Sequence, residues 1–290
     1  MPSVADYPHA GSRFLNVGCG LHFHPDWVNV DAVPASRGVI PADVRKGLPF
    51  ADEVFDAVYC SHVLEHLPRQ EASNLLRQMH RVSRPGGVIR VVVPDLETLA
   101  REYLRLLDEL KSESKMSASD YDWILLEMYD QAVRDRSGGE TARFLAAPDL
   151  PNREFVLSRI GAEAERAWQV SRIPVASRLL DRIRTRGLRW LVEAVRVRIA
   201  GLLVGLVGGK TARSAYFEGV FRQSGEVHRW MYDSFSLGRA LKDAGFVNVR
   251  RRSAFDSAVP GFSSYWLDVD KKMRVRKPDS LFMEAERPRV

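Results

Sequence analysis

The chain has 290 residues, 45% of them hydrophobic and 28% charged, which is the composition of a globular protein long enough for a full core. Its two cysteines, Cys19 and Cys60, exclude a disulfide framework and fit a reducing compartment. The opening residues lack the apolar region of a signal peptide, and no apolar run reaches the roughly 20 residues that span a bilayer, so we expect a cytoplasmic protein.

The net charge of +6 is concentrated in one segment. Residues 172–213 carry ten basic and two acidic side chains, so the rest of the chain is slightly acidic. The arginines alternate with apolar residues and run into the apolar stretch 202–207. A basic amphipathic helix of this kind either lies at a membrane surface or packs on its own domain with a solvated arginine face, and both readings stay open.

The first third of the chain predicts strands that alternate with helices. Apolar runs predict strands at 14–18, 27–31, 38–43, 55–60 and 88–93. A helix is expected from 68 to 84, stopped by the turn 85–87, and a second helix begins at Pro94-Asp95 and continues to Leu110. This alternation indicates a parallel sheet with both faces covered.

A polar break at 111–120 starts a long helical block that ends near residue 225. The sheet pattern then returns with a helix that begins at Ser234, its expected N-cap, and stops at Gly245, followed by strands at 246–249 and 281–285. We therefore expect an α/β, doubly wound fold. Its core comprises 1–110 and 226–290, and a helical insertion at 111–225 shapes the acceptor site.

The turn after the first strand predicts a nucleotide-type cofactor. Gly18-Cys19-Gly20 follows one strand, and Asp31 ends the next. Glycines admit positive φ and let a ligand lie against bare backbone, while a carboxylate can accept two hydrogen bonds from a ribose diol. Ligands of doubly wound sheets bind at such strand ends.

Two further segments resemble a known family. Residues 55–67 (FDAVYCSHVLEHL) and 81–87 (RVSRPGG) are similar to the class I S-adenosylmethionine-dependent methyltransferases, in particular to a large bacterial subgroup. The resemblance covers about 13–110 and, weakly, the end from about 226. It implies a Rossmann-like, seven-stranded, mostly parallel sheet with its last strand antiparallel, and methyl transfer from S-adenosylmethionine.

The resemblance also implies roles for single residues. The backbone of Gly18, Cys19 and Gly20 would lie against the amino acid and ribose portions of the cofactor, and Asp31 would hold the ribose hydroxyls. Asp43 with Val44 would read the adenine amino group, and Ser61 and His62 would lie near the methionine moiety.

The chain departs from the family pattern in two ways. Asn16, which we also place at the cofactor, stands where the family often has an acidic residue. Only ten residues separate Gly20 from Asp31, so the usual first helix is shortened or missing. A nicotinamide-dependent oxidoreductase would carry its acidic residue roughly 20 residues beyond the glycines, so this spacing disfavours it.

Candidates for acceptor chemistry lie where the insertion rejoins the core. His228 and Tyr232 should roof the acceptor site, and a histidine there could take a proton from an acceptor hydroxyl. We expect no metal site, because no cysteine pair or second histidine pair accompanies His22, His24 and Asp26. No motif for a nucleic-acid partner is recognisable.

We therefore expect an S-adenosylmethionine-dependent methyltransferase that methylates a hydroxyl of a sugar, glycan or other small molecule. A lipid-linked acceptor would fit contact of segment 172–213 with the inner face of the membrane. Two alternatives stay open: a catalytically inactive homologue that binds the cofactor and acts as a membrane-associated partner, and the oxidoreductase. The sequence does not predict the oligomeric state.

Overall fold

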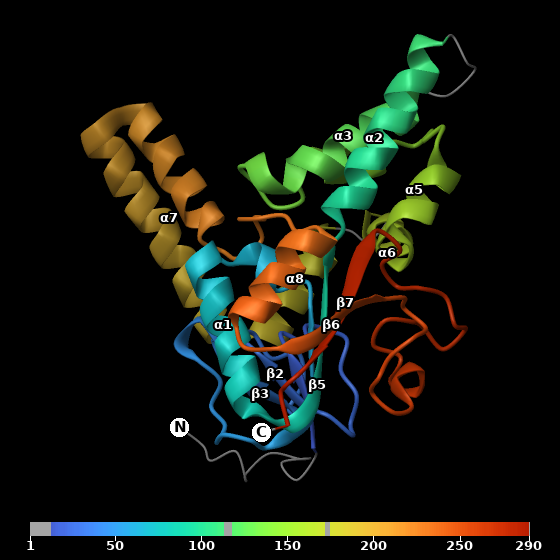
Figure 1. Ribbon diagram of the computed structural model, residues 1–290. Coiled ribbons are helices and arrows are strands. Elements are labelled where there is room, and N and C mark those ends of the chain that lie inside the picture. Colours follow the sequence, from blue (N-terminus) through green and yellow to red (C-terminus); the bar gives the residue numbers. More distant parts are fainter. Residues whose placement is uncertain (1–12, 113–117, 172–174, 290) are drawn as a thin grey trace.

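A computed structural model describes residues 13–112, 118–171 and 175–289, with the side chains of 170–190 excluded (Figure 1). Seven strands form one sheet in the order β3-β2-β1-β4-β5-β7-β6. They are β1 (Phe14–Val17), β2 (Val28–Asp31), β3 (Val39–Pro41), β4 (Phe55–Ser61), β5 (Ser83–Pro94), β6 (Val247–Arg252) and β7 (Ser280–Glu286). Strands β1 to β5 pair in parallel, and β7 is antiparallel to both neighbours. The predicted Rossmann-like α/β fold is confirmed.

The described helices are α1 (Arg69–Val82), α2 (Leu96–Lys111), α3 (Ala118–Val133), α4 (Gly139–Leu145), α5 (Arg153–Ile160), α6 (Ala162–Ser171), α7 (Val175–Arg222) and α8 (Ser234–Asp243). Short 3-10 turns lie at η2 (Val44–Lys46), η3 (Leu64–His66) and η4 (Phe262–Tyr265). No helix lies between β1 and β2, where residues 18–27 form turns, as the short spacing predicted.

Two predicted boundaries are wrong. Helix α1 ends at Val82, because β5 already begins at Ser83 and absorbs the 85–87 turn as an irregularity in its pairing with β4. The N-cap of α8 is Asp233, whose side chain accepts a hydrogen bond from the backbone of Ser236 at 2.7 Å. Ser236 reciprocates, so the pair forms a capping box that outcompetes Ser234.

The two faces of the sheet are covered differently. On one face α1 and α8 bury residues such as Leu75, Met79 and Leu237 against the strands. On the other face the core contains Trp27 together with Phe262, Leu267 and other side chains of the segment 254–269. This irregular segment covers a face where a doubly wound fold normally places helices, which agrees with the absence of a first helix.

A buried charge network fastens that segment to the sheet. Arg90 of β5 is fully buried and donates through Nε to Asp268 at 2.6 Å and through Nη1 to Glu284 at 2.8 Å. Asp268 also accepts a hydrogen bond from the Tyr59 hydroxyl at 2.6 Å. Arg90 also donates to the carbonyls of Ser253 and Asp256, so the network fastens residues 253–268 to the sheet.

Helices α2 to α6 form a second layer with its own core. Leu99 and Leu106 of α2 pack with Trp123 of α3 and Trp168 of α6, among others. Figure 1 shows this layer beyond the edge at which the parallel strands end. This layer of helices thus lies over the expected ligand-binding edge.

Helix α7 folds back on itself and projects from the body (Figure 1). Gly209 has a φ of +76°, which interrupts the helix, and a Cβ placed on Gly201 would come within 2.3 Å of the Phe217 ring, so the two arms pack closely. Among the described residues, no helix is long and apolar enough to cross a membrane.

Candidate active site

The glycine turn after β1 combines tight packing with an open side. Gly18 and Gly20 have φ values of +67° and +53°. A Cβ on Gly18 would come within 2.3 Å of Val63, whereas the corresponding position at Gly20 has no atom within 4 Å. Gly18 is therefore required by packing, and Gly20 leaves backbone accessible to a ligand.

Asp31 lies directly beside this turn. Its Oδ2 accepts a hydrogen bond from the Gly20 amide and its Oδ1 one from the Val33 amide, both at 2.8 Å. A carboxylate offers about four lone-pair sites, so acceptor capacity remains for two hydroxyl groups. The geometry fits a ribose diol at this position.

Asp43 is more heavily engaged. Its carboxylate binds the Arg45 guanidinium at 2.8 and 2.9 Å, and hydrogen bonding from Arg45 lowers the pKa of Asp43. It also caps η2, whose first residue, Val44, packs against the core. The ion pair with Arg45, which the sequence analysis did not predict, occupies much of the carboxylate proposed to read adenine.

Two buried amides hold the short turn in place of a helix. Asn16 Nδ2 donates to the His22 carbonyl and to Asn29 Oδ1, each at 3.0 Å. Asn29 Nδ2 in turn donates to the carbonyls of His24 and Trp27 at 2.9 and 2.6 Å. Asn16 therefore holds the loop in place. It stands at the position where the family that the sequence resembles often has an acidic residue.

A cavity of about 370 Å³ opens beside this turn. Six of the predicted cofactor residues line it: Asn16, Gly18, Cys19, Gly20, Ser61 and His62. Asp31, Asp43 and Val44 lie outside the cavity, on the side toward β2 and β3. The cavity thus matches the methionine end of the predicted site, and the adenosine end is more open.

The far wall of this first cavity is basic. Arg166 of α6 and Arg276 and Lys277 of the segment before β7 line it. Burial and these three cations lower the pKa of His22, another lining residue, to about 4. No motif surrounds these residues in the sequence, so only the fold could bring them to the site.

A second cavity of about 150 Å³ adjoins the first. His62, Glu163 and Lys277 line both, and Lys277 Nζ lies 2.8 Å from Glu163 Oε1. His62 has a φ of +53°, unusual for a residue with a side chain, and its Nε2 lies 2.9 Å from the Ser280 hydroxyl. Such strained positions cluster at functional sites, and this one stands where the cavities meet.

The two predicted acceptor-site residues differ in position. His228 lines the second cavity, and burial lowers the pKa of its ring to about 3. Tyr232 lines neither cavity: it is 5% exposed within the core, and burial raises the pKa of its hydroxyl to about 12. His228 therefore faces ligand space and Tyr232 does not.

Asp279 is a residue of the second cavity that sequence reasoning missed. Burial and the nearby carboxylates of Glu127 and Glu163 raise the pKa of Asp279 to about 7. Its carbonyl accepts a hydrogen bond from the Asp95 amide at 3.0 Å, which fixes it at the carboxyl end of β5. A carboxyl group that titrates near neutrality is suited to proton transfer.

Comparison with known proteins finds methyltransferases among the proteins similar to this chain. Residues 15–91 match the family described as "Methyltransferase domain". The demethylmenaquinone methyltransferase of Corynebacterium urealyticum is 43% identical over 63 residues, 20% of this chain and 26% of that protein. The methyltransferase GfsG of Streptomyces halstedii is 25% identical over 202 residues, 55% of this chain and 68% of that protein.

Among solved structures, the N-methyltransferase NodS of Bradyrhizobium japonicum, in complex with S-adenosyl-l-homocysteine, is 16% identical with a TM-score of 0.26 over 34% of this chain and 68% of that one. The chain spans only about a quarter to a third of the length of the demethylmenaquinone methyltransferases that it matches. The strand order and the glycine turn establish the α/β fold, and residues 15–91 of the chain are similar to a methyltransferase domain.

Proposed function

We propose that the protein transfers a methyl group from S-adenosylmethionine to a hydroxyl of a sugar, a glycan or another small molecule. The observation that carries this proposal is the pair of adjoining cavities at the carboxyl ends of β1, β4 and β5, with His62 at their junction. One cavity belongs to the cofactor turn, and the other lies under the insertion. A donor and an acceptor could thus meet at His62.

The residues present fit the cofactor. Gly20 offers open backbone, Asp31 retains capacity for two hydroxyls, and the cations Arg166 and Arg276 suit the carboxylate of the methionine moiety, while Lys277 is paired with Glu163. The bound cofactor supplies a methyl group already activated on a sulfonium. Positioning by the protein can then provide much of the rate.

Asp279 is our preferred base in the second cavity. As the acceptor oxygen bonds to the methyl carbon and the carbon–sulfur bond breaks, the hydroxyl proton would pass to the Asp279 carboxylate. Its pKa of about 7 suits that task better than the pKa of about 3 of His228. His228 would then orient the acceptor, and Tyr232, within the core, would support the segment that carries it.

The lining of the second cavity supports a hydroxylated acceptor. Glu127, Gln131 and Thr141 line the cavity beside Asp95 and Asp279, with Glu127 paired to Arg159 and the Thr141 hydroxyl bonded to Asp130. Such groups can hydrogen-bond several hydroxyls of one acceptor. The relatives named for demethylmenaquinone imply a quinone acceptor, for which this polar lining is less suited.

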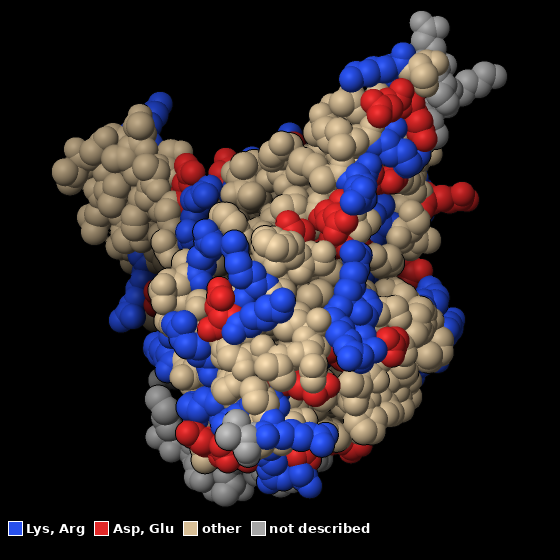
Figure 2. Space-filling model, viewed as in Figure 1, with Lys and Arg blue, Asp and Glu red and all other residues tan. Residues whose placement is uncertain are grey.

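We also propose that the α7 hairpin contacts a membrane surface, which would bring a lipid-linked acceptor within reach. Leu206 and Val207 at its bend are 82% and 92% exposed, and Figure 2 shows the projecting hairpin as largely uncharged. Lys210 and Arg213 follow the bend, and Arg196 and Arg198 precede it. An apolar tip with flanking cations is typical of an interfacial anchor.

Calorimetric titration with S-adenosylhomocysteine, with NAD as the control, tests the cofactor. We expect micromolar binding of the first ligand and none of the second. Binding of NAD alone would favour the oxidoreductase. Binding of S-adenosylhomocysteine without methylated product from cell-extract glycans or lipid-linked sugars would favour the inactive homologue.

A further inference from the structure

A buried carboxylate beneath the second cavity lies among histidine side chains. Glu65 of η3 has no exposed surface, and neither of its side-chain oxygens has a hydrogen bond of normal geometry among the described residues. His62 Nδ1 lies 3.1 Å from Glu65 Oε1, and His66 Nε2 lies 4.0 Å from the same oxygen. A buried carboxylate is costly unless a cation or several donors compensate it.

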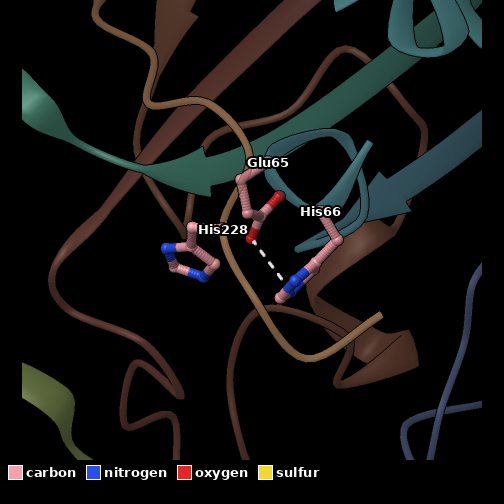
Figure 3. A group of neighbouring side chains, drawn as sticks. All are labelled: Glu65, His66 and His228. Atoms are coloured by element: carbon pink, nitrogen blue, oxygen red, sulfur yellow. Dashed lines mark ion pairs between the residues drawn. The ribbon is translucent and has the colours of Figure 1, made fainter. Parts of the chain in front are cut away.

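Two histidines converge on this carboxylate. One ligand atom each from Glu65, His66 and His228 lies within 4.8 Å of the other two. Figure 3 shows the Glu65 carboxylate facing the His66 ring, with the His228 ring beside them. The two imidazole rings stand edge to face with centroids 4.8 Å apart.

The surrounding backbone fixes these side chains. His66 Nδ1 lies 3.4 Å from the Val227 carbonyl, which favours a proton on Nδ1 and leaves Nε2 as the free ligand atom. The Glu65 carbonyl accepts hydrogen bonds from the Arg229 and Trp230 amides at 2.6 and 3.2 Å. The segment that carries His228 is thereby bound to the turn that carries Glu65.

We propose that Glu65, His66 and His228 bind a divalent transition-metal ion. Two imidazole nitrogens and one carboxylate oxygen form a ligand set that suits Zn²⁺ and related ions. With metal–ligand bonds of about 2.1 Å, the ligand atoms around a tetrahedral ion stand about 3.4 Å apart. The distances between the three ligand atoms must therefore shorten by roughly 1 Å when the ion binds. The ion would also neutralise the buried charge of Glu65.

The proposed site has an open position toward ligand space. His66 and His228 both line the second cavity, whereas Glu65 lies behind them. A three-residue site with a free coordination position is the arrangement of catalytic rather than structural metal centres. On the proposed function, on which this step rests, an acceptor hydroxyl bound there would become more acidic before its proton passes to Asp279. The sequence suggested no metal because His228 lies far along the chain from the pair at 65–66.

Titration of the purified, metal-free protein with Co²⁺ tests the proposal, because the visible absorption of Co²⁺ reports its coordination. We expect each chain to bind one Co²⁺ ion, with the strong visible absorption of a low-coordinate site. Added Zn²⁺ should displace the Co²⁺ and abolish this absorption. The variants His66→Gln and His228→Gln should each weaken binding at least tenfold. The matched control His80→Gln, on α1 and away from the cavities, should bind as the wild type does.

Equal Co²⁺ affinity in the wild type and in a His66→Gln/His228→Gln double variant would overturn the proposal, as would the absence of absorption at saturating Co²⁺. Circular dichroism of each variant separates loss of the site from loss of the fold, and Glu65→Gln provides a second variant that keeps both histidines. Binding of S-adenosylhomocysteine is measured separately. A protein that binds Co²⁺ but not S-adenosylhomocysteine would contradict the proposed function and leave the proposed metal site unaffected.

Discussion

Replacing Asp31 with alanine should weaken cofactor binding by an amount that the contacts of this residue set. Each carboxylate oxygen already accepts one backbone hydrogen bond at 2.8 Å, from Gly20 and from Val33. The remaining lone pairs can accept two ribose hydroxyls, and hydrogen bonds to a charged group contribute about 1.5–3 kcal/mol each. Water partly replaces the lost bonds, so we expect a net loss of about 1–3 kcal/mol, or about 5- to 150-fold in Kd.

Asp31→Ala has a second effect that must be separated from the first. The Gly20 and Val33 amides lose their acceptor, which loosens the glycine turn. Asp31→Asn keeps the volume and one acceptor oxygen, so it should hold the turn better than alanine does while still losing part of the ribose contact. Comparison of the two variants shows how much of the lost binding free energy comes from the missing ribose contact and how much from the loosened glycine turn.

The assay is calorimetric titration with S-adenosylhomocysteine, combined with thermal unfolding to confirm that each variant is folded. Asp243→Ala is the matched control, because Asp243 is an exposed aspartate at the end of α8. A folded Asp31→Ala variant whose Kd stays within about twofold of the wild type would refute the ribose assignment and reduce Asp31 to a loop-bracing residue.

Three further predictions test other parts of the molecule. If Asp279 is the base, kcat/KM should rise with pH through a pKa near 7 as its carboxyl loses a proton, and Asp279→Asn should remove that limb and lower the rate by about 10²- to 10⁴-fold. The folded pKa of Asp279 is raised from 3.8, so the native state holds the proton more tightly and stability should fall as pH rises from 3.8 to about 7. In urea titrations, the free energy of unfolding of Asp279→Asn should fall less with rising pH than that of the wild type. An identical fall in both proteins would show that Asp279 does not cause it. Arg90→Ala removes the paired cation from the buried carboxylate of Asp268 and leaves Glu284 with Arg252 alone, so it should lower the free energy of unfolding by about 3–5 kcal/mol, whereas a change below about 1 kcal/mol would show that the network is not structural. Leu206→Glu with Val207→Glu should abolish sedimentation with anionic vesicles and leave S-adenosylhomocysteine binding unchanged, and wild-type protein that never sediments would end the membrane proposal.

The sequence alone determined the parallel half of the sheet and the location of the cofactor turn. Residues 88–93 of β5 are β-branched except for Arg90, and such a run is a local property that does not depend on the rest of the fold. The glycine turn and Asp31 are separated by only ten residues, so their proximity also follows from local geometry. The same spacing correctly predicted that no full helix follows β1.

Only the tertiary structure decided the composition of the two cavities. Asp279 and Lys277 precede the last strand, Glu163 belongs to the insertion, and His228 meets Glu65 across more than half of the chain. None of these residues carries a local pattern, because side chains at strand ends converge through sheet order and not through sequence spacing. The buried Arg90 network and the hairpin at Gly209 likewise depend on long-range packing, which hydrophobic periodicity does not encode.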